Sequence, residues 1–422
     1  MKKTILVILL VFLSVFAVII QPGRILAYST QDTVEQQITI GEAGNTPYVT
    51  SVAISGVDAV AAGDDGVYFF ERERREPGGD WVYKQKLIQS GLPPFDYPHS
   101  FGYRVAISGN VAMVAGYIGE YSGSTSFQVY IYEKDMSGVW QEKQTIFNSN
   151  YPIYLSPNIA VVLGYVLTLT GEGPYCTLYE KNSSGYWSAT KRIDNCYSIN
   201  ISGNNMLAFQ ASDAWETYQP WSRVNIFERV GTYGTWVQKQ DQWLQVHKRF
   251  SGNISGNSAI IGDPAADNTK GAAYVIERDS SAGVWRNKQK LIASDGMTGD
   301  RFGENVFIFD KQAFVLQNNY VLHKRTVYFF EQTGSEGQWV EKQKLTPKEA
   351  MEYTFGSKVV VSENFLFIVS SKALYIYQKD ISSGTWEEKR VISINNNASV
   401  DISGRSVIIG AGDKVYFYNF IR

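Results

Sequence analysis

The feature that most constrains the fold is a segment of four short apolar runs that recurs along the chain. Its clearest copy, residues 101–146, reads FGYRVAISGNVAMVAG, then a polar loop, then QVYIYEKD, then a short turn and VWQEKQTI. Gly, Asn, Ser or Asp separates the runs, which is the pattern of short strands and tight turns. Four strands form a sheet too small to bury its own faces, so successive copies must pack on one another.

The first two runs of each copy meet at a turn that marks the register of the repeat. In the clearest copy this turn is Gly109-Asn110, which tolerates the positive φ angles of a two-residue hairpin. The spacing between copies is roughly 41 to 54 residues, which is the length of a propeller blade. The full Ile-Ser-Gly step stands at Ile54–Gly56, Ile107–Gly109, Ile201–Gly203, Ile254–Gly256 and Ile402–Gly404, with weaker copies at Tyr154–Pro157, Phe307–Asp310 and Val360–Glu363.

The third and fourth strands of the repeat carry a glutamate and a tryptophan at fixed places. We interpret both as structural, because a catalytic pair would break the repeat rather than follow it, and we expect the carboxylates to pair with a lysine of the next strand. The glutamates are Glu71, Glu133, Glu180, Glu228, Glu277 and Glu331. The tryptophans are Trp81, Trp140, Trp187, Trp236, Trp285, Trp339 and Trp386.

The repeat is incomplete at its C-terminal end. There are about eight first hairpins but only seven Trp-led fourth strands, because the sequence ends just after a third strand. The segment Val34–Thr39 (VEQQIT) is similar to Val340–Leu345 (VEKQKL) and supplies the missing strand. We predict that it completes the last blade, because such closure pairs strands that would otherwise be open edges.

At these residues the chain resembles the FG-GAP repeat family, whose repeats are the blades of integrin α-subunit N-terminal-type β-propellers and their bacterial relatives. The resemblance rests on the FGxxVAISGN opening, the VYxFE strand and the WxxKQKL tail, and it spans about residues 33–420. The Phe-Gly pair stands at Phe101-Gly102, Phe302-Gly303 and Phe355-Gly356. The resemblance implies an all-β propeller of four-stranded antiparallel blades. The repeat count gives eight blades, and integrin heads have seven, which is the alternative if the weak unit at Tyr154–Gly164 is an insertion.

The N-terminus predicts export. Lys2 and Lys3 precede an apolar run, and a small residue, Ala27, stands at a plausible cleavage point. We predict a signal peptide over residues 1–27 and one propeller domain over 28–422, with an uncleaved membrane anchor as the alternative. In an oxidising compartment Cys176 and Cys196 favour a disulfide, and two buried thiols are the alternative.

Metal binding and catalysis find little support in the sequence. The resemblance implies calcium loops between first and second strands, but a tight Ser-Gly-Asn turn stands there, so that site does not carry over. Two other acidic turns, Asp64-Asp65-Gly66 and the segment with Asp263 and Asp267, are weak calcium candidates and are interpreted as solvated turns. The three histidines, His99, His247 and His323, lie in no catalytic motif. We therefore expect no cofactor and no enzyme activity.

Two loops are the candidate binding sites. Trp215, Tyr218 and Trp221 share an insertion between second and third strands, where aromatic rings could stack on a sugar or seat a partner's apolar side chain. The resemblance implies that such loops, and those between blades, line the ligand face; Gln89–Ser100, with Phe95 and Tyr97, would lie on the same side. The alternative is that these aromatic rings fold back onto their blades.

The sequence thus predicts a secreted or cell-surface, non-catalytic propeller that binds or adheres to an extracellular protein or glycan. A formal net charge of −2 gives no electrostatic footprint for nucleic acid. Contact with a membrane is expected only if the leader is uncleaved. The alternatives are a carbohydrate-active enzyme, which needs convergent carboxylates, and a structural scaffold.

Overall fold

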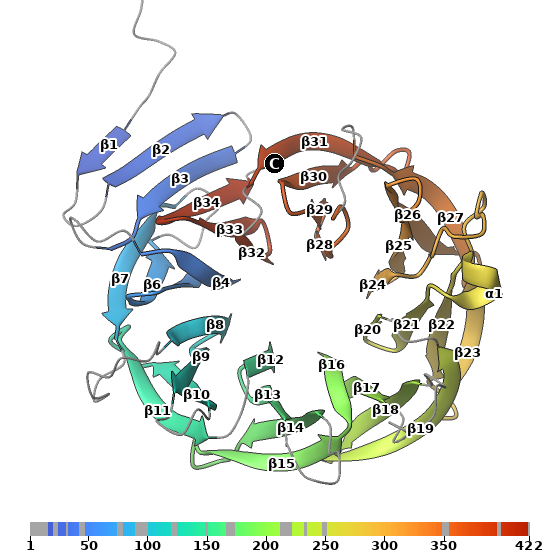
Figure 1. Cartoon of the computed structure of the whole chain (residues 1–422), viewed down its shortest axis with the longest axis horizontal. Coiled ribbons are helices and arrows are strands. Elements are labelled where there is room, and N and C mark those ends of the chain that lie inside the picture. Colours follow the sequence, from blue (N-terminus) through green and yellow to red (C-terminus); the bar gives the residue numbers. More distant parts are fainter. Residues whose placement is uncertain are drawn as a thin grey trace, which may run out of the picture. The chain divides into compact units, whose positions relative to one another are not determined.

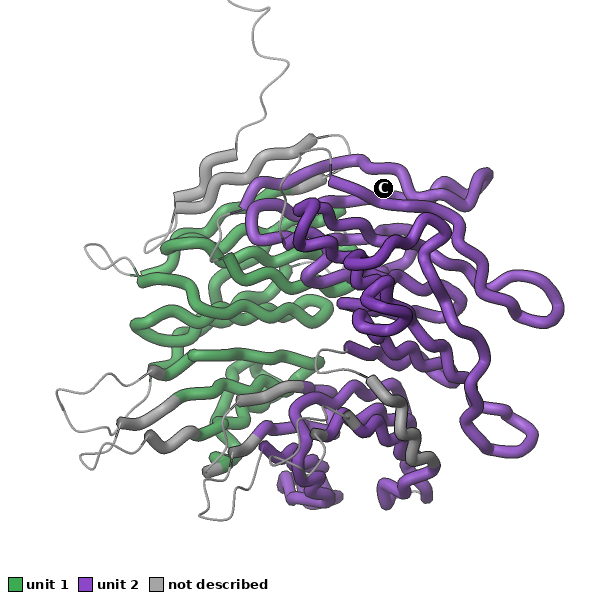
Figure 2. Tube along the Cα trace, turned by 45° about the vertical axis from the view of Figure 1, so that its right-hand side comes forward, with its two compact units in different colours: residues 1–147, 397–422 green, residues 148–396 purple. Residues whose placement is uncertain are grey.

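A computed structural model describes most of the chain, which divides into two compact units (Figure 2). Unit 1 comprises residues 1–147 and 397–422, and unit 2 comprises residues 148–396. The described residues are 16–19, 24–30, 33–41, 47–73, 79–88, 100–119, 125–147, 151–165, 174–211, 222–231, 234–246, 251–347, 354–394 and 398–420.

Unit 1 holds three four-stranded antiparallel blades, numbered 1, 2 and 8 by the chain order of their first strands (Figure 1). Blade 8 takes its fourth strand, β3 (Thr33–Thr39), from the N-terminal part of the chain. Its other strands are β32 (Ser399–Ser403), β33 (Ser406–Ala411) and β34 (Lys414–Phe420). Blades 1 and 2 consist of β4 (Val49–Ser55), β5 (Asp58–Gly63), β6 (Gly66–Arg72), β7 (Trp81–Leu87), β8 (Ser100–Ser108), β9 (Val111–Gly119), β10 (Thr125–Lys134) and β11 (Trp140–Phe147).

Unit 2 holds blades 3 to 7, each a consecutive four-stranded antiparallel meander. Blades 3 and 4 consist of β12 (Tyr151–Leu155), β13 (Ile159–Tyr165), β14 (Pro174–Lys181), β15 (Trp187–Asp194), β16 (Cys196–Ser202), β17 (Asn205–Ala211), β18 (Ser222–Val230) and β19 (Thr235–Val246). Blades 5 to 7 consist of β20 (Gly252–Ser255), β21 (Ser258–Asp263), β22 (Ala272–Asp279), β23 (Val284–Leu291), β24 (Asn305–Phe309), β25 (Gln312–Asn319), β26 (Lys324–Thr333), β27 (Gln338–Leu345), β28 (Lys358–Ser362), β29 (Phe365–Val369), β30 (Ala373–Lys379) and β31 (Trp386–Ser393). A single helical turn, α1 (Ala266–Thr269), lies between β21 and β22.

The fold class is an all-β propeller of eight four-stranded blades, as the repeat count predicted. The weak unit around Tyr154 is a true blade rather than an insertion, because β12 pairs with β13 in the same meander as β14 and β15. The seven-bladed alternative is therefore wrong.

Residues of the predicted leader also form strands in unit 1. Arg24–Thr30 (β2) pairs with β3, and Phe16–Ile19 (β1) pairs with β2. Among the described residues, the sheet that contains the four strands of blade 8 therefore has six strands. Cleavage after Ala27 stays a prediction. Among the described residues, no helix is both long and apolar enough to cross a membrane.

The recurring tryptophans lie between neighbouring blades of each unit. Trp81 is fully buried among residues of blades 8 and 1, where its ring stacks on Phe417 at 4.6 Å between centroids. Trp339 is buried with residues of blades 5 and 6, including Phe302. The predicted packing role is confirmed for these tryptophans, because they fill interfaces that a single blade cannot close.

The serine of the Ile-Ser-Gly step also joins neighbouring blades. Its hydroxyl oxygen accepts a hydrogen bond from the backbone N–H at the corresponding turn of the next blade: Gly56 N–H donates to Ser403 Oγ and Gly109 N–H to Ser55 Oγ, each at 3.0 Å. The same bond joins Gly256 to Ser202 and Asp310 to Ser255. First strands have no ladder partner on this side, so these side chains satisfy backbone donors that would otherwise be unpaired.

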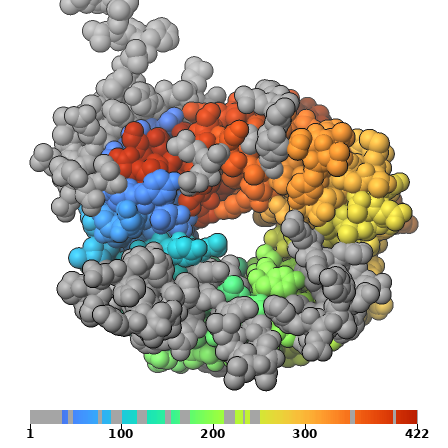
Figure 3. Space-filling view, viewed as in Figure 1, coloured from blue at the N-terminus to red at the C-terminus, as the bar shows by residue number. Residues whose placement is uncertain are grey.

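The N-terminal strand closes blade 8 as the sequence predicted, and a glutamine fixes its position. Gln36 Nε2 donates to the Trp81 carbonyl and its Oε1 accepts from the Trp81 N–H, both at 2.6 Å. Fourth-strand glutamines of other blades clamp the next tryptophan in the same way, as Gln289 does with Trp339. At the surface, red C-terminal residues meet blue N-terminal residues (Figure 3).

The two cysteines form the predicted disulfide. Cys176 of β14 and Cys196 at the start of β16 are buried and bonded, 20 residues apart in the chain. The bond joins blade 3 to the first strand of blade 4. Because it closes a loop of this length, it removes conformational freedom mainly from the unfolded chain.

Removing the clamp tests closure by β3. We expect Gln36→Ala to lower the free energy of unfolding by about 2 kcal/mol, because it leaves the Trp81 N–H and carbonyl buried without partners. Gln37→Ala is the matched control, since Gln37 lies on the other face of the same strand and is only partly buried. Urea unfolding of both variants measures the effect, and equal stabilities would contradict this account of closure.

The Phe-Gly pairs mark a close approach between blades. Gly303 has a φ of 95°, and a Cβ at this position would lie 2.2 Å from the Ala272 carbonyl oxygen of the preceding blade. Only glycine combines this backbone conformation with so short a contact.

We therefore expect Gly303→Ala to cost about 3 kcal/mol of folding stability, from backbone strain and overpacking together. The matched control is Gly299→Ala, because Gly299 has a similar φ of 91° but open space where the Cβ would be. We expect about 1 kcal/mol there, from the backbone alone. Thermal and denaturant unfolding compare the two, and a similar loss would show that the contact is unimportant.

Candidate functional site

The aromatic residues proposed from the sequence as ligand contacts lie outside the described part of the structure. Trp215, Tyr218 and Trp221 fall within residues 212–221, and Phe95 and Tyr97 fall within residues 89–99. Their role as a binding surface stays a prediction. The described residues do show where the second of these segments starts, since it follows directly after β7 and Ile88.

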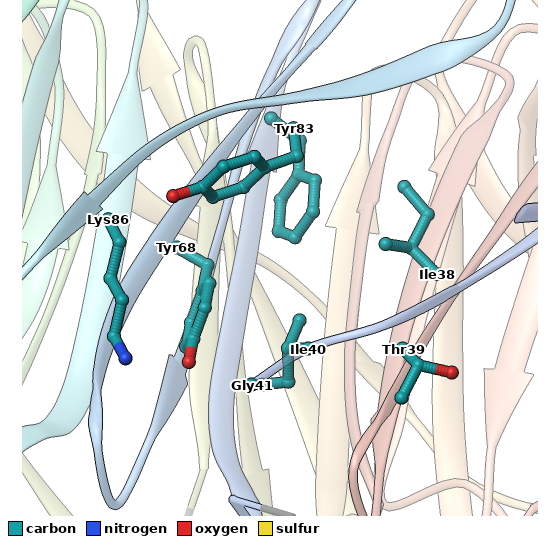
Figure 4. A pocket seen from close by; sticks show the side chains of 8 residues that line it. Ile38, Thr39, Ile40, Gly41, Tyr68, Tyr83 and Lys86 are labelled. Carbon is teal, nitrogen blue, oxygen red and sulfur yellow. The ribbon is translucent and has the colours of Figure 1, made fainter. Parts of the chain in front are cut away.

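A pocket lies at this end of blade 1 (Figure 4). It has a volume of about 60 Å³ and opens between β3 of blade 8 and strands β6 and β7 of blade 1, both in unit 1. This space holds a few water molecules, or one chemical group of a larger ligand. The lining residues are Ile38, Thr39, Ile40, Gly41, Tyr68, Phe70, Tyr83 and Lys86.

One side of the pocket carries a connected acid, tyrosine and lysine. The Tyr68 hydroxyl donates to the carboxylate of Asp65 at 2.6–2.7 Å, and Lys86 Nζ lies 2.8 Å from the same carboxylate. The lysine also stands over the Tyr68 ring, 5.1 Å from its centroid. Figure 4 shows Tyr68 and Lys86 side by side, across the pocket from Ile38. The carboxylate thus holds both side chains in place.

The opposite side of the pocket is apolar, and its rim is aromatic. Ile38 and Ile40 are buried side chains of the N-terminal segment, and Phe70 is buried in blade 1. Tyr83 is 42% exposed, and its ring lies 6.2 Å from Tyr68 and 6.3 Å from Phe70. An apolar floor with a few fixed polar groups at the rim is the usual composition of a small-ligand site.

The acid–tyrosine–lysine arrangement recurs in blade 6 of unit 2, and blade 5 repeats the lysine–acid pair with the lysine over the ring of Tyr274. Lys344 Nζ lies 2.9 Å from the carboxylate of Asp295, which also accepts from the Tyr328 hydroxyl at 2.7 Å. In blade 5, Lys290 pairs with Asp267 at 2.7 Å. The tyrosine and the lysine come from matching strand positions, whereas the acid comes from a different loop in blade 6 than in blades 1 and 5.

These ion pairs and hydrogen bonds shift the pKa values of the groups that form them. The hydrogen bond from Lys344, together with that from Tyr328, lowers the pKa of Asp295. The hydrogen bond to Asp267 raises the pKa of Lys290. Burial raises the pKa of Tyr328, and its bond to Asp295 adds to the effect. All three shifts keep the pairs charged and the tyrosine neutral near pH 7.

The two weak calcium candidates, Asp263 and Asp267, have partners within the protein. The expectation of a solvated turn is wrong for Asp263, which is buried, and fits Asp267, which is exposed. Asp263 is buried and its Oδ1 accepts from the Ala265 N–H at 3.1 Å, and Asp267 is paired with Lys290. In the part of the chain that the structure describes, no group of three or more His, Cys, Asp or Glu side chains could hold a metal ion. Whether the protein binds calcium stays a question for experiment.

The recurring glutamates are structural. The predicted pairing with a lysine of the next strand holds for Glu277, which lies 3.7 Å from Lys288, but other glutamates pair with a cation of the next blade. Glu180 of blade 3 accepts from Trp236 Nε1 at 2.7 Å and pairs with Arg229 at 2.8 Å, both in blade 4. The cation therefore comes from the third strand of the next blade, because the glutamate side chain crosses the interface. The same pattern joins Glu228 to Trp285 and Arg278, and Glu277 to Trp339.

Comparisons with known proteins identify the repeat. Residues 285–315, from the fourth strand of blade 5 to the second strand of blade 6, match the FG-GAP repeat family. The propeller thus contains an FG-GAP repeat. The matched segment includes Phe302-Gly303, where the glycine makes the close inter-blade contact described above. No curated protein sequence matches the chain.

Solved structures share the fold at low sequence identity. The Saccharomyces cerevisiae Sqt1 structure aligns with a TM-score of 0.53 and 11% identity, over 89% of this chain and 97% of that one. A putative 6-phosphogluconolactonase from Bacteroides uniformis aligns with a TM-score of 0.47 and 11% identity, over 78% and 93%. The periplasmic gluconolactonase PpgL of Pseudomonas aeruginosa gives 0.46 and 14%, over 82% and 95%.

The prediction that the protein is not an enzyme is contradicted. Propellers named as gluconolactonases are among the structures that align with this FG-GAP propeller. Identities of 11–14% show the fold alone, so they assign no reaction to this chain.

The pair in blade 6 gives a test of pH dependence. Because the folded protein lowers the pKa of Asp295, the pair stabilises the fold above about pH 4, and this contribution is lost as the pH falls through the folded pKa. We expect Asp295→Asn to cost about 0.5 kcal/mol at pH 7, since the carboxylate is half exposed, and the difference from wild type to vanish near pH 2.

Asp310→Asn is the control for this measurement, because Asp310 is an exposed turn residue. Denaturant unfolding at several pH values compares both variants with the wild type. A difference for Asp295→Asn that stays constant down to pH 2 would contradict the assigned ion pair.

Proposed function

We propose that this FG-GAP propeller is an exported recognition protein that binds an extracellular glycan or protein, and that the pocket of blade 1 is part of its binding site. The observation that carries the proposal is the combination in one small pocket of an apolar floor, an exposed tyrosine and a fixed lysine–carboxylate pair. Propeller blades supply rigid positions for such groups, and the loops that leave them supply variety.

The chemistry of the pocket suits a sugar ring or a mixed polar and apolar side chain. Tyr83 offers a ring face to the apolar side of a pyranose, and Lys86, which Asp65 holds in place, offers a donor for its hydroxyl groups. The pair is already formed, so little order is lost when a ligand binds.

Export is the second part of the proposal. The predicted signal peptide, the Cys176–Cys196 disulfide and the FG-GAP repeats support a secreted or cell-surface location. Fractionation of the producing cells, with the N-terminal sequence of the mature protein, tests this part directly.

A binding screen tests the recognition site. The purified protein is applied to arrays of glycans and extracellular-matrix proteins, with and without a calcium chelator. We expect Tyr83→Ala to weaken the binding of a hit by about tenfold with little change in the melting temperature, because the ring lies at the rim. Tyr186→Ala is the matched control, since Tyr186 is also an exposed tyrosine but lies in the turn before β15 of blade 3.

The outcomes of the screen separate the candidate sites. A hit lost in Trp215→Ala/Trp221→Ala but kept in Tyr83→Ala would move the site to the insertion of blade 4. A hit that needs calcium would restore the acidic turns as metal ligands. Equal binding by all variants would refute the proposed pocket. Product analysis of any glycan hit determines whether the bound ligand is also cleaved.

A further inference from the structure

A second surface, on blade 6, exposes apolar side chains at the turn between β25 and β26. Tyr320, Val321 and Leu322 are 46%, 83% and 63% exposed, in a turn of four residues that His323 closes with a φ of 51°. Single exposed apolar residues are common on protein surfaces, but three in one turn form a patch that needs an explanation.

The turn is held so that its apolar residues cannot fold back onto the blade. The Leu322 N–H donates to Asn319 Oδ1 at 2.8 Å, and Asn319 Nδ2 donates to the buried Asp300 at 2.7 Å. The Tyr320 hydroxyl donates to Glu304 at 2.7 Å, and Arg301 stands over the Tyr320 ring at 5.1 Å. These bonds leave Val321 and Leu322 as the protruding pair.

Another exposed apolar side chain, Met297, lies on a neighbouring loop of the same unit. Met297 is 63% exposed, and its N–H donates at 2.7 Å to Asp300, the carboxylate that also anchors Asn319. One buried aspartate thus fixes both loops. We call Met297, Tyr320, Val321 and Leu322 the apolar tip.

Some of the basic side chains around the apolar tip are neutralised by ion pairs, and others are not. Arg301 is paired with Glu304, and Lys344 with Asp295. Lys324, which directly follows the turn, and Lys270 on the loop of α1 are exposed, and neither has an ion pair among the described residues. Available positive charge therefore lies beside protruding apolar groups.

We propose that the apolar tip docks onto a lipid bilayer that carries anionic headgroups. Val321 and Leu322 are strongly exposed at the end of a turn between two strands, so they can insert between headgroups. Tyrosine is favoured at the depth of the interface, aliphatic side chains are favoured below it, and lysines contact anionic headgroups beside it. Docking of this kind is reversible, and it would hold the propeller at a cell surface even after the leader is removed.

Vesicle sedimentation of the full-length purified protein tests the proposal. The vesicles contain either phosphatidylcholine alone or phosphatidylcholine with phosphatidylglycerol. We expect partitioning to the phosphatidylglycerol vesicles that weakens as salt rises. Val321→Asp/Leu322→Asp should lower the partition coefficient by about tenfold or more, and Lys324→Glu by about fivefold.

Ile381→Asp is the matched control. Ile381 is 89% exposed, but it lies in the turn between β30 and β31, at the opposite strand ends from the apolar tip. We expect this variant to bind vesicles like the wild type. A milder pair, Val321→Ser/Leu322→Ser, repeats the test if the aspartate variant fails to fold.

Three results would overturn the proposal. In the first, the wild type does not sediment with phosphatidylglycerol vesicles. In the second, the Val321/Leu322 double variant and Lys324→Glu bind the vesicles as the wild type does. In the third, Ile381→Asp loses as much vesicle binding as the tip variants. The last result would indicate general surface hydrophobicity, and the first two would leave a protein partner as the occupant of the tip.

Discussion

Every blade depends on the packing of its neighbour, because a four-stranded sheet of this size leaves both faces apolar. Trp81 and Phe417 stack between two blades of unit 1, and Trp339 packs with Phe302 between two blades of unit 2. The polar parts of the repeat serve the same interfaces. Glutamate, glutamine and serine side chains cross from one blade to the next and satisfy indole and backbone groups there.

This division of labour explains where function can lie. The repeated glutamate, glutamine, serine and tryptophan side chains are used by the interfaces, so they are not free to contact a ligand. The candidate sites are places where a blade departs from the repeat or adds to it: the pocket beside β3, the insertion of blade 4 and the turn after β25. Variation at such loops leaves the inter-blade contacts intact.

Much of the fold could be predicted from the sequence, because its physical causes repeat. Eight first hairpins and seven tryptophans were enough to predict that Val34–Thr39 completes the last blade. The cross-blade partner of the glutamates was missed, since a single strand pattern does not show that Glu180 reaches Arg229 in another blade. A comparison of the Lys-Gln-Lys runs of the fourth strands could have shown that Lys86, Lys290 and Lys344 occupy equivalent positions.

The acid of each trio could not be found in this way. Asp65 and Asp267 lie between second and third strands, whereas Asp295 lies between blades, so no fixed spacing relates them to their lysines. Function was predicted still less well, because a fold shared by binding proteins and enzymes does not distinguish between them.

The pairing of β3 with β34 also orders events in time. Val34 lies opposite Asn419, so this ladder joins residues that lie 385 positions apart in the sequence. The ring contact of Trp81 with Phe417 spans a similar separation, and contacts of such long sequence separation are slow to form. A chain threaded across a membrane from its N-terminus would therefore remain unfinished at this blade until its final strand emerged, with Ile38 and Phe70 exposed to chaperones or to other chains in the meantime.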